Sequence, residues 1–186
     1  IMETTRGCPY ACTFCDLGAL NHNKVYKTEL GRVQEELDWL VENKLSSFYY
    51  VDNNFGLFKD RDDTIVDMVI ASKEKHGYPK SFFVNWAKNH KEEFINMAKK
   101  LYDADVLQSI TLSLQTRNEE ALEIIKRKTM NINDISFYTD MCKQVGLPYS
   151  TELMLGNPGE TVDSWKDGYI EVVADGISCD IYAVAL

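Results

Sequence analysis

Short apolar runs that are typical of β-strands alternate along this chain with amphipathic stretches that are typical of helices. The predicted strands cover residues 1–5, 47–52, 81–86, 109–115, 149–155 and 178–184, and the predicted helices cover residues 30–43, 62–76, 90–104, 118–128, 133–145 and 161–174. One strand with its helix takes roughly 30 to 40 residues, the size of a βαβ unit. The alternation predicts an α/β fold with a parallel sheet, and six successive units favour a partial TIM-like barrel of about six parallel β/α units.

The length and the charge of the chain exclude several broad classes. Its 186 residues suffice for one domain with a core of its own. The formal net charge of −9 disfavours non-specific binding to nucleic acid. No apolar run is long enough to span a bilayer, so we expect no membrane partner. The five cysteines are an odd number and do not resemble a secreted disulfide framework, which favours a reducing, cytoplasmic location.

Both ends of the sequence are unusual for a complete protein. The chain begins with Ile1 rather than with methionine, and it ends in the strand-like run 179–186. We therefore expect residues 1–186 to form a single core domain excised from a longer protein, whose N-terminal and C-terminal parts are absent from this chain.

Three cysteines, Cys8, Cys12 and Cys15, lie within eight residues in a C-x3-C-x2-C arrangement. Three thiolates can hold three irons of a [4Fe–4S] cluster and leave the fourth iron open to a small molecule. A zinc site is an alternative, but it needs a fourth ligand, and His22 is the candidate nearby. A disulfide-redox pair would use one C-x2-C and leave Cys8 without a role. Spacing favours the cluster and leaves the alternatives open.

Polar residues and glycines gather where the predicted strands end. The second strand ends in Asp52-Asn53-Asn54, the third in Asn85-Trp86, the fourth carries Ser113 and Gln115, and the fifth carries Glu152 and runs into Gly156. Each group alone is equally well explained as a turn, because Asn, Asp and Gly are common turn formers. In parallel β/α folds the functional groups lie at the carboxyl ends of strands. Groups after several strands therefore predict a ligand site at that edge.

The cysteine run, together with these strand ends, resembles the radical S-adenosylmethionine (radical SAM) enzymes, and in particular the cobalamin-linked and coproporphyrinogen-type members. The resemblance implies a [4Fe–4S] cluster held by Cys8, Cys12 and Cys15, with SAM as the second cofactor. It implies reductive cleavage of SAM to a 5′-deoxyadenosyl radical, which abstracts hydrogen from an unknown substrate. The enzyme would be of the oxidoreductase or methyltransferase type.

The resemblance also implies roles for individual residues. Phe14 would lie by the adenine of SAM, and the backbone of the fifth-strand motif from Glu152 to Gly156 would pair with the adenine edge. The second-strand end, with Asp52, Asn53 and Asn54, takes the place where the family binds the SAM amino group, through one or another of these three residues. In the fourth-strand motif that begins at Ser113, Gln115 would hold a ribose hydroxyl, Asn85 would add a ribose contact, and Arg127 would pair with the carboxylate. By position alone, Arg127 would be a solvated helix charge beside Lys126 and Lys128. The motif instead favours the carboxylate contact, which suits a planar guanidinium.

Two functions from different classes follow from these patterns. The first is a radical SAM enzyme acting on a small molecule or another unknown substrate, with a low-potential electron donor such as a ferredoxin or flavodoxin. By resemblance to the cobalamin-linked members, cobalamin would be bound by a domain outside this chain. The second is an interaction domain in which the cysteines hold zinc as a structural staple.

Overall fold

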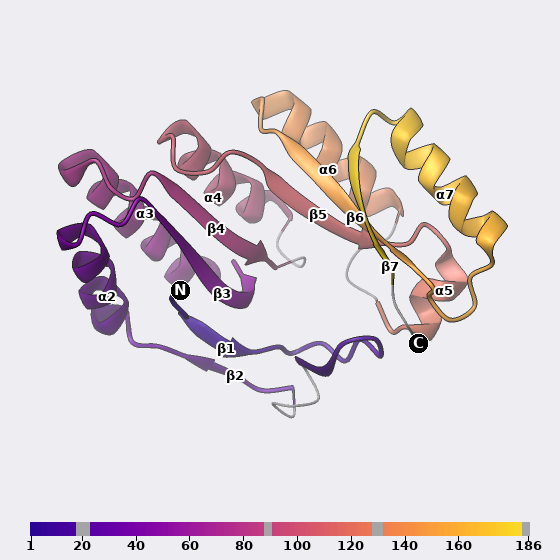
Figure 1. Cartoon of the computed structure of the whole chain (residues 1–186), viewed down its shortest axis with the longest axis horizontal. Coiled ribbons are helices and arrows are strands. Elements are labelled where there is room, and N and C mark those ends of the chain that lie inside the picture. Colours follow the sequence, from indigo (N-terminus) through magenta and orange to yellow (C-terminus); the bar gives the residue numbers. More distant parts are fainter. Residues whose placement is uncertain (18–22, 88–90, 128–131, 184–186) are drawn as a thin grey trace. The chain divides into compact units, whose positions relative to one another are not determined.

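The computed structural model describes residues 1–17, 23–87, 91–127 and 132–183 (Figure 1). By its contacts the chain divides into two compact units. Unit 1 consists of Ile1–Pro9 and Leu20–Gln108, and unit 2 consists of Tyr10–Ala19 and Ser109–Leu186. The cysteine run is therefore shared, because Cys8 belongs to unit 1 whereas Cys12 and Cys15 belong to unit 2.

Unit 1 is built on two parallel strands, β3 (Ser47–Phe55) and β4 (Ser81–Trp86). Met2 adds a parallel bridge to Tyr50 on the other side of β3. The helices of this unit are α2 (Leu30–Glu42), α3 (Lys59–His76) and α4 (Lys91–Asp103), and Figure 1 shows them beside β3 and β4. The apolar residues of α2 recur at helical spacing and are buried, as the sequence pattern predicts: Val33, Leu37, Leu40 and Val41.

The short strands β1 (Thr5–Gly7) and β2 (Val25–Lys27) form an antiparallel pair in unit 1. The first predicted strand, residues 1–5, is therefore partly wrong, because Met2 bridges β3 while the regular strand begins at Thr5. The second strand, β2, lies outside the six predicted units. The cysteine run begins at Cys8, directly after β1 ends at Gly7.

Aromatic side chains form the core of unit 1. Tyr50 contacts Phe48 and Phe82 edge-on, with ring centroids 5.2 and 5.0 Å apart. Phe55, at the end of β3, packs against Trp86 at the end of β4, with a centroid distance of 5.5 Å. Aromatic rings are rigid and bury a large apolar area. These contacts fix the carboxyl ends of the two strands against each other.

Unit 2 contains the parallel strands β5 (Ile110–Gln115), β6 (Tyr149–Leu155) and β7 (Ser178–Ala183), paired in chain order. Its helices are α5 (Glu119–Ile124), α6 (Ile132–Val145) and α7 (Val162–Ala174), and α6 and α7 lie alongside the sheet in Figure 1. Cys142 on α6 is buried, and burial raises the pKa of its thiol to about 11. Cys179 on β7 is half-buried.

Two helix boundaries differ from the predicted ones by about one turn, whereas the others agree to within a residue. Helix α3 begins at Lys59, one turn before the predicted residue 62, because Asp62 lies inside its first turn and accepts hydrogen bonds from the backbone N–H groups of Gly56 and Phe58. Helix α5 ends at Ile124 rather than at residue 128, because the backbone at Lys126 is left-handed, with φ of +55°. Arg127 therefore follows the helix instead of extending from its last turn.

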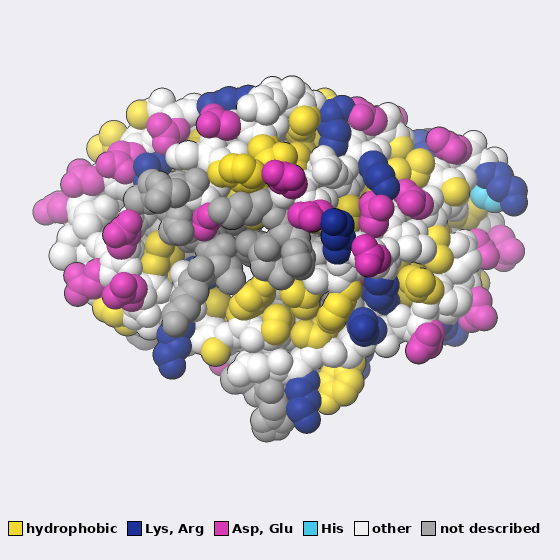
Figure 2. Space-filling view, turned by 180° about the vertical axis from the view of Figure 1, so that it is seen from behind, with side chains coloured by type: hydrophobic (Ala, Val, Ile, Leu, Met, Phe, Trp, Pro, Cys, Tyr) yellow, Lys and Arg dark blue, Asp and Glu magenta, His cyan; other side chains and the backbone are white. Residues whose placement is uncertain are grey.

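The predicted α/β class with parallel strands is confirmed in both units. No closed sheet is present among the described strands, and the six-unit partial barrel remains a prediction. None of the helices in the described part of the chain combines the length and the apolar character needed to cross a bilayer. On the face drawn in Figure 2, acidic and basic side chains are interspersed.

Candidate functional site

The β3–β4 ladder is interrupted where the polar residues of β3 lie. Tyr50 pairs with Val84, and the next pair is Phe55 with Trp86, so four residues of β3 stand against a single residue of β4. Irregularities of this kind re-aim side chains and are common beside functional sites. Residues 52–54, called here the 52–54 segment, lie in this interruption. Their side chains contact the chain that leads to the first cysteine.

Asp52 is fully buried and holds the backbone at the start of β1. Its Oδ1 accepts hydrogen bonds from the N–H groups of Thr4 (2.6 Å) and Thr5 (2.9 Å), and its Oδ2 accepts one from the Thr4 hydroxyl. Burial raises the pKa of the Asp52 carboxyl, although these hydrogen bonds and the charge of Arg61 act in the opposite direction. Because both oxygens are engaged in the interior, this geometry favours an anchoring role over the predicted contact with the SAM amino group.

Arg61 on α3 extends the same network. Its Nη2 donates to the carbonyl of Thr4 (2.9 Å) and to the carbonyl of Thr28 (2.7 Å), which follows β2. Its Nη1 lies 3.0 Å from Asp62, whose other oxygen caps the turn after β3. One guanidinium therefore joins the segments before β1 and after β2 to the start of α3. Sequence reasoning missed Arg61, since an Arg within an Asp-rich helix start gives no signal of burial.

Asn53 and Asn54 contact the next points along the same chain. The amide nitrogen of Asn53 donates to the carbonyl of Gly7 (3.3 Å), and that of Asn54 lies 3.2 Å from the sulfur of Cys8. Asn54 is nearly buried, with 5% of its surface exposed. The structure thus brings two predicted site residues, Asn54 and Cys8, into direct contact. Asn85, predicted on β4, is exposed near the end of that strand.

In unit 2, the other two cysteines of the run, Cys12 and Cys15, lie in a loop that is hydrogen-bonded to the end of α5. The N–H of Cys15 donates to the carbonyl of Cys12 (3.2 Å), and the N–H of Thr13 donates to the carbonyl of Ile125 (3.0 Å). Phe14, which precedes Cys15 in the chain, is half-buried. The backbone therefore holds the Cys12–Cys15 turn beside the residues that lead to Arg127.

Arg127 is held by the end of β5 and by the cysteine loop. Its Nη2 donates to the carbonyl of Ser113 (2.9 Å), and its Nη1 lies 3.9 Å from the sulfur of Cys12. Its Nε is buried and has no hydrogen-bond partner among the described residues. The alternative of a solvated helix charge is wrong for this residue. A guanidinium with a buried, unused donor is suited to bind an anionic group.

The β5–β6 ladder is interrupted near the end of β5, as the β3–β4 ladder is near the end of β3. Leu112 pairs with Thr151 of β6, and the next pair is Gln115 with Leu153, so the ladder is again irregular. Gln115 is buried and has a left-handed backbone, with φ of +77°. This conformation is energetically unfavourable for a residue other than glycine, and residues of this kind cluster at ligand sites. The conformation of Gln115 therefore supports a ligand site at the carboxyl end of β5.

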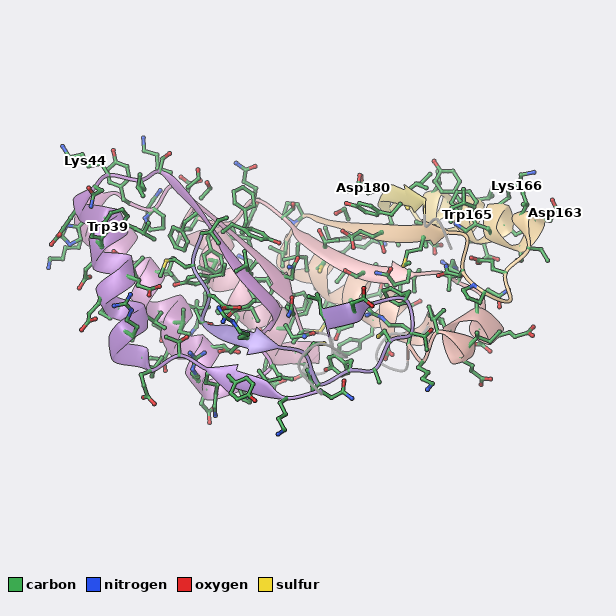
Figure 3. The ribbon with its side chains drawn as sticks, turned by 60° about the horizontal axis from the view of Figure 1, so that its bottom comes forward. Trp39, Lys44, Asp163, Trp165, Lys166 and Asp180 are labelled. Carbon is green, nitrogen blue, oxygen red and sulfur yellow. The ribbon has the colours of Figure 1, made fainter. Side chains whose placement is uncertain are left out.

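A network of side chains stabilises the turn after β6. Asn157 donates to the carbonyl of Met154 (3.0 Å) and to Glu160 (3.2 Å), while the Thr116 hydroxyl donates to the other oxygen of Glu160. Trp165 of α7, labelled in Figure 3, also donates its indole N–H to Met154. The Oδ1 atom of Asn157 is buried without a partner in the described chain. Sequence reasoning did not single out Asn157, although it directly follows Gly156 of the fifth-strand motif.

Two of the predicted β6 residues border this turn. Gly156 has φ of +105°, a conformation that a side chain would strain. Glu152 lies half-buried on β6, opposite Asp180 of β7. Gly156 therefore permits the chain to leave the strand sharply, whereas Glu152 has no contact within the described residues that bears on its predicted role.

The three clustered cysteines have the chemistry that an iron–sulfur cluster requires. All are free thiols, and each is partly exposed. Hydrogen-bond donors face the sulfurs of Cys8 and Cys12, an arrangement that would stabilise the negative charge of metal-bound thiolates. No three His, Cys, Asp or Glu side chains are grouped as metal ligands within the described residues, so the ligand set remains a prediction. His22, the fourth ligand of the zinc alternative, lies outside the described residues.

Comparison with known proteins identifies relatives of this chain. The family model of the radical SAM superfamily matches residues 2–168. The cobalamin-dependent radical SAM methyltransferase TokK of Streptomyces tokunonensis is 34% identical over 168 residues, covering 90% of this chain and 24% of that protein. The 2-(S-pantetheinyl)-carbapenam-3-carboxylate methyltransferase of Streptantibioticus cattleyicolor is 33% identical over 181 residues, covering 97% of this chain and 26% of that protein.

A solved structure shares the fold. The methyltransferase TsrM of Kitasatospora setae, determined with cobalamin and a [4Fe–4S] cluster bound, superposes with a TM-score of 0.80 at 18% identity. The match covers 98% of this chain and 36% of that one. The chain also spans only about a quarter of the length of the two curated relatives.

Proposed function

The chain belongs to the radical SAM superfamily, and from this premise we propose that it is the core of an iron–sulfur enzyme that cleaves SAM reductively. In such an enzyme the [4Fe–4S] cluster supplies the electron that generates a 5′-deoxyadenosyl radical from SAM. The protein contributes the ligands, the orientation of SAM and the exclusion of water. The observation that carries the proposal is the pair of donors facing the clustered thiols, Asn54 at Cys8 and Arg127 at Cys12.

Cys8, Cys12 and Cys15 would hold the cluster. Their spacing keeps the three thiols within a few residues of one another along the chain. Thiolates carry negative charge, and the N–H donors of Asn54 and Arg127 stabilise such charge. The zinc-stapled interaction domain does not require a guanidinium with an unused donor or a strained Gln115, so these features favour the enzyme.

SAM would be bound by groups at the ends of β5 and β6. The buried Nε of Arg127 is available to the carboxylate of SAM, and the left-handed Gln115 would position a ribose hydroxyl. Gly156 would let the strand backbone approach the adenine, where the unpaired Oδ1 of Asn157 offers an acceptor to its amino group. Phe14, Asn85 and Glu152 are retained as further candidate contacts on the basis of resemblance.

The net reaction that we propose is methyl transfer to a small molecule. The two curated relatives are both named as methyltransferases, and one of them as cobalamin-dependent. Cobalamin would be bound by a part of the protein outside this chain, and a low-potential ferredoxin or flavodoxin would supply electrons in the cytoplasm. The six-unit partial barrel, with residues 1–186 as one core domain, is the architecture that we propose for this chemistry.

The proposed function is tested by loading the full-length protein with iron and sulfide under anaerobic conditions. We expect a brown protein with broad absorbance at about 400 nm, because thiolate-to-iron charge transfer absorbs there. Addition of SAM and a strong reductant should release 5′-deoxyadenosine, which liquid chromatography detects. A colourless protein that instead retains stoichiometric zinc would support the structural-staple alternative.

Replacing Arg127 with alanine should weaken SAM binding to the cluster-loaded protein by about tenfold or more. A hydrogen bond to a charged group contributes about 1.5–3 kcal/mol, and Arg127 has an unused buried donor. Isothermal calorimetry measures the affinity. Lys126→Ala is the matched control, because Lys126 is an exposed neighbouring cation. Equal SAM affinities in Arg127→Ala and the wild type would remove Arg127 from the proposed site.

A further inference from the structure

The 52–54 segment contacts three successive points on the chain that leads to Cys8. Asp52 binds Thr4 and Thr5, Asn53 binds Gly7, and Asn54 binds Cys8 itself. We propose that this segment positions the first cysteine and that Asn54 donates a hydrogen bond to its sulfur, which raises the reduction potential of the cluster. The inference rests on the proposed function, since it concerns the same cysteine.

The contact between Asn54 and Cys8 has a defined polarity once the thiol binds metal. The amide nitrogen of Asn54 lies 3.2 Å from the sulfur of Cys8. A metal-bound thiolate has lost its proton and can only accept a hydrogen bond. The NH2 end of the amide must therefore face the sulfur, whereas the oxygen end would repel it. Asn54 is the right side chain for this position because it offers a neutral donor.

The surrounding structure holds Asn54 in place before any metal is bound. The backbone carbonyl of Asn54 accepts a hydrogen bond from the N–H of Leu57 (3.2 Å), and the N–H of Gly56 in the same turn donates to the buried Asp62 (2.8 Å). With 5% of its surface exposed, Asn54 has little freedom to turn toward solvent. The donor is therefore preorganised, and little conformational entropy is lost when it meets the thiolate.

A donor at a ligand sulfur acts on the electron-transfer equilibrium. Reduction adds negative charge to the cluster, and part of it resides on the ligand sulfurs, so a hydrogen bond to sulfur stabilises the reduced state more than the oxidised state. Hydrogen bonds to cluster sulfurs are among the factors that set reduction potentials. Asn54 should therefore make the cluster easier to reduce, which is the step that precedes SAM cleavage.

The donor role of Asn54 and the SAM contact that resemblance assigns to it predict different results for an Asn54 variant. A residue that binds SAM changes the affinity for SAM and leaves the potential of the SAM-free cluster unchanged. A donor to Cys8 changes the potential of the SAM-free cluster and leaves the affinity for SAM unchanged. The two measurements together separate the roles.

The experiment compares wild type with Asn54→Leu in the full-length protein, because leucine is close to asparagine in size and has no donor. The cluster is loaded anaerobically, and its reduction is followed by electron paramagnetic resonance against applied potential, without SAM. We expect the reduction equilibrium to become about tenfold less favourable, which corresponds to about 59 mV for one electron. Iron content, sulfide content and SAM affinity should match the wild type.

Asn53→Leu is the matched control, because its amide donates to the carbonyl of Gly7 and not to a sulfur. Its cluster should keep the wild-type potential. If Asn54→Leu does not retain the cluster, Asn54→Asp serves in its place: it keeps the shape, replaces the donor with a carboxylate, and should lower the potential further than leucine does.

Each outcome bears on the inference. A wild-type potential in Asn54→Leu or in Asn54→Asp overturns it, and unchanged potential with weakened SAM binding assigns Asn54 to SAM instead. A lowered potential in Asn53→Leu equal to that of Asn54→Leu overturns the donor role of Asn54, because the effect would then come from the position of the loop and not from the hydrogen bond to sulfur. Failure of the wild type to load a cluster contradicts the proposed function itself and is recognised before any variant is compared.

Discussion

Replacing Cys8, Cys12 or Cys15 with alanine should abolish iron loading of the full-length protein. A [4Fe–4S] cluster held by three thiolates has one iron without a protein ligand, and the loss of another thiolate leaves too few bonds to retain it. Iron and acid-labile sulfide are measured per chain after anaerobic reconstitution. We expect about four of each in the wild type and close to none in the three variants.

The other two cysteines provide the controls. Cys142 is buried on α6, and its thiol pKa of about 11 disfavours the thiolate that binds metal. Burial also raises the pKa of Cys179 on β7. Cys142→Ala and Cys179→Ala should therefore load iron like the wild type. Wild-type iron content in Cys12→Ala would show that the ligands are assigned wrongly.

The sequence predicted the regular strands well where a short apolar run is bounded by turn residues. The predicted limits of β4 (Ser81–Trp86) and β6 (Tyr149–Leu155) are those of the structure. Both strands belong to parallel pairs that are covered by helices, and burial imposes an apolar composition that is visible locally. Strand β2 (Val25–Lys27) was missed because its three residues are exposed or half-exposed, and its pairing with β1 depends on a distant segment.

Positions of the candidate residues along the chain were predictable, whereas their partners were not. An Asp at a strand end has the same local pattern whether it binds a ligand or anchors the backbone. The partners of Asp52 lie 47 and 48 residues away in sequence, so no nearby residue reveals the anchoring role. Only the structure distinguishes Asp52, which faces inward, from Asn54, which reaches Cys8.

The left-handed backbone at two residues in or beside the candidate site could not be predicted from the sequence either. Gln115 and Lys126 both adopt positive φ, at +77° and +55°, although neither is glycine or asparagine. The residue types that usually signal a left-handed backbone are Gly and Asn. For this reason the helix over residues 118–128 was predicted too long, and the exit of the chain toward Arg127 was not foreseen. The motif nevertheless singled out Arg127 and Gln115.

Replacing Asp52 with alanine should strongly destabilise the protein even without a cluster. The change leaves the buried N–H groups of Thr4 and Thr5 without an acceptor. Each unsatisfied buried donor costs about 1–3 kcal/mol, so the two together predict a loss of about 2–6 kcal/mol in the free energy of unfolding. Urea denaturation of the metal-free, full-length protein measures this loss in the unfolding transition of the core.

Hydrogen–deuterium exchange locates the effect of the same variant. The amides of Thr4 and Thr5 should exchange much faster in Asp52→Ala, because the acceptor that protects them is gone. Asp38→Ala is the control. Asp38 is exposed on α2, where it accepts a hydrogen bond from the Gln34 side chain, so its loss should change stability by less than about 0.5 kcal/mol.

The variant Asp52→Asn distinguishes the contribution of the hydrogen-bond acceptor from that of the negative charge. Asparagine keeps one oxygen that can accept from Thr4 and Thr5, but it loses the second acceptor, which binds the Thr4 hydroxyl, and the charge beside Arg61. We expect its loss of unfolding free energy to lie between those of Asp38→Ala and Asp52→Ala. If Asp52→Ala were as stable as the wild type and still bound SAM more weakly once loaded, Asp52 would be a ligand contact and not an anchor of the chain before Cys8.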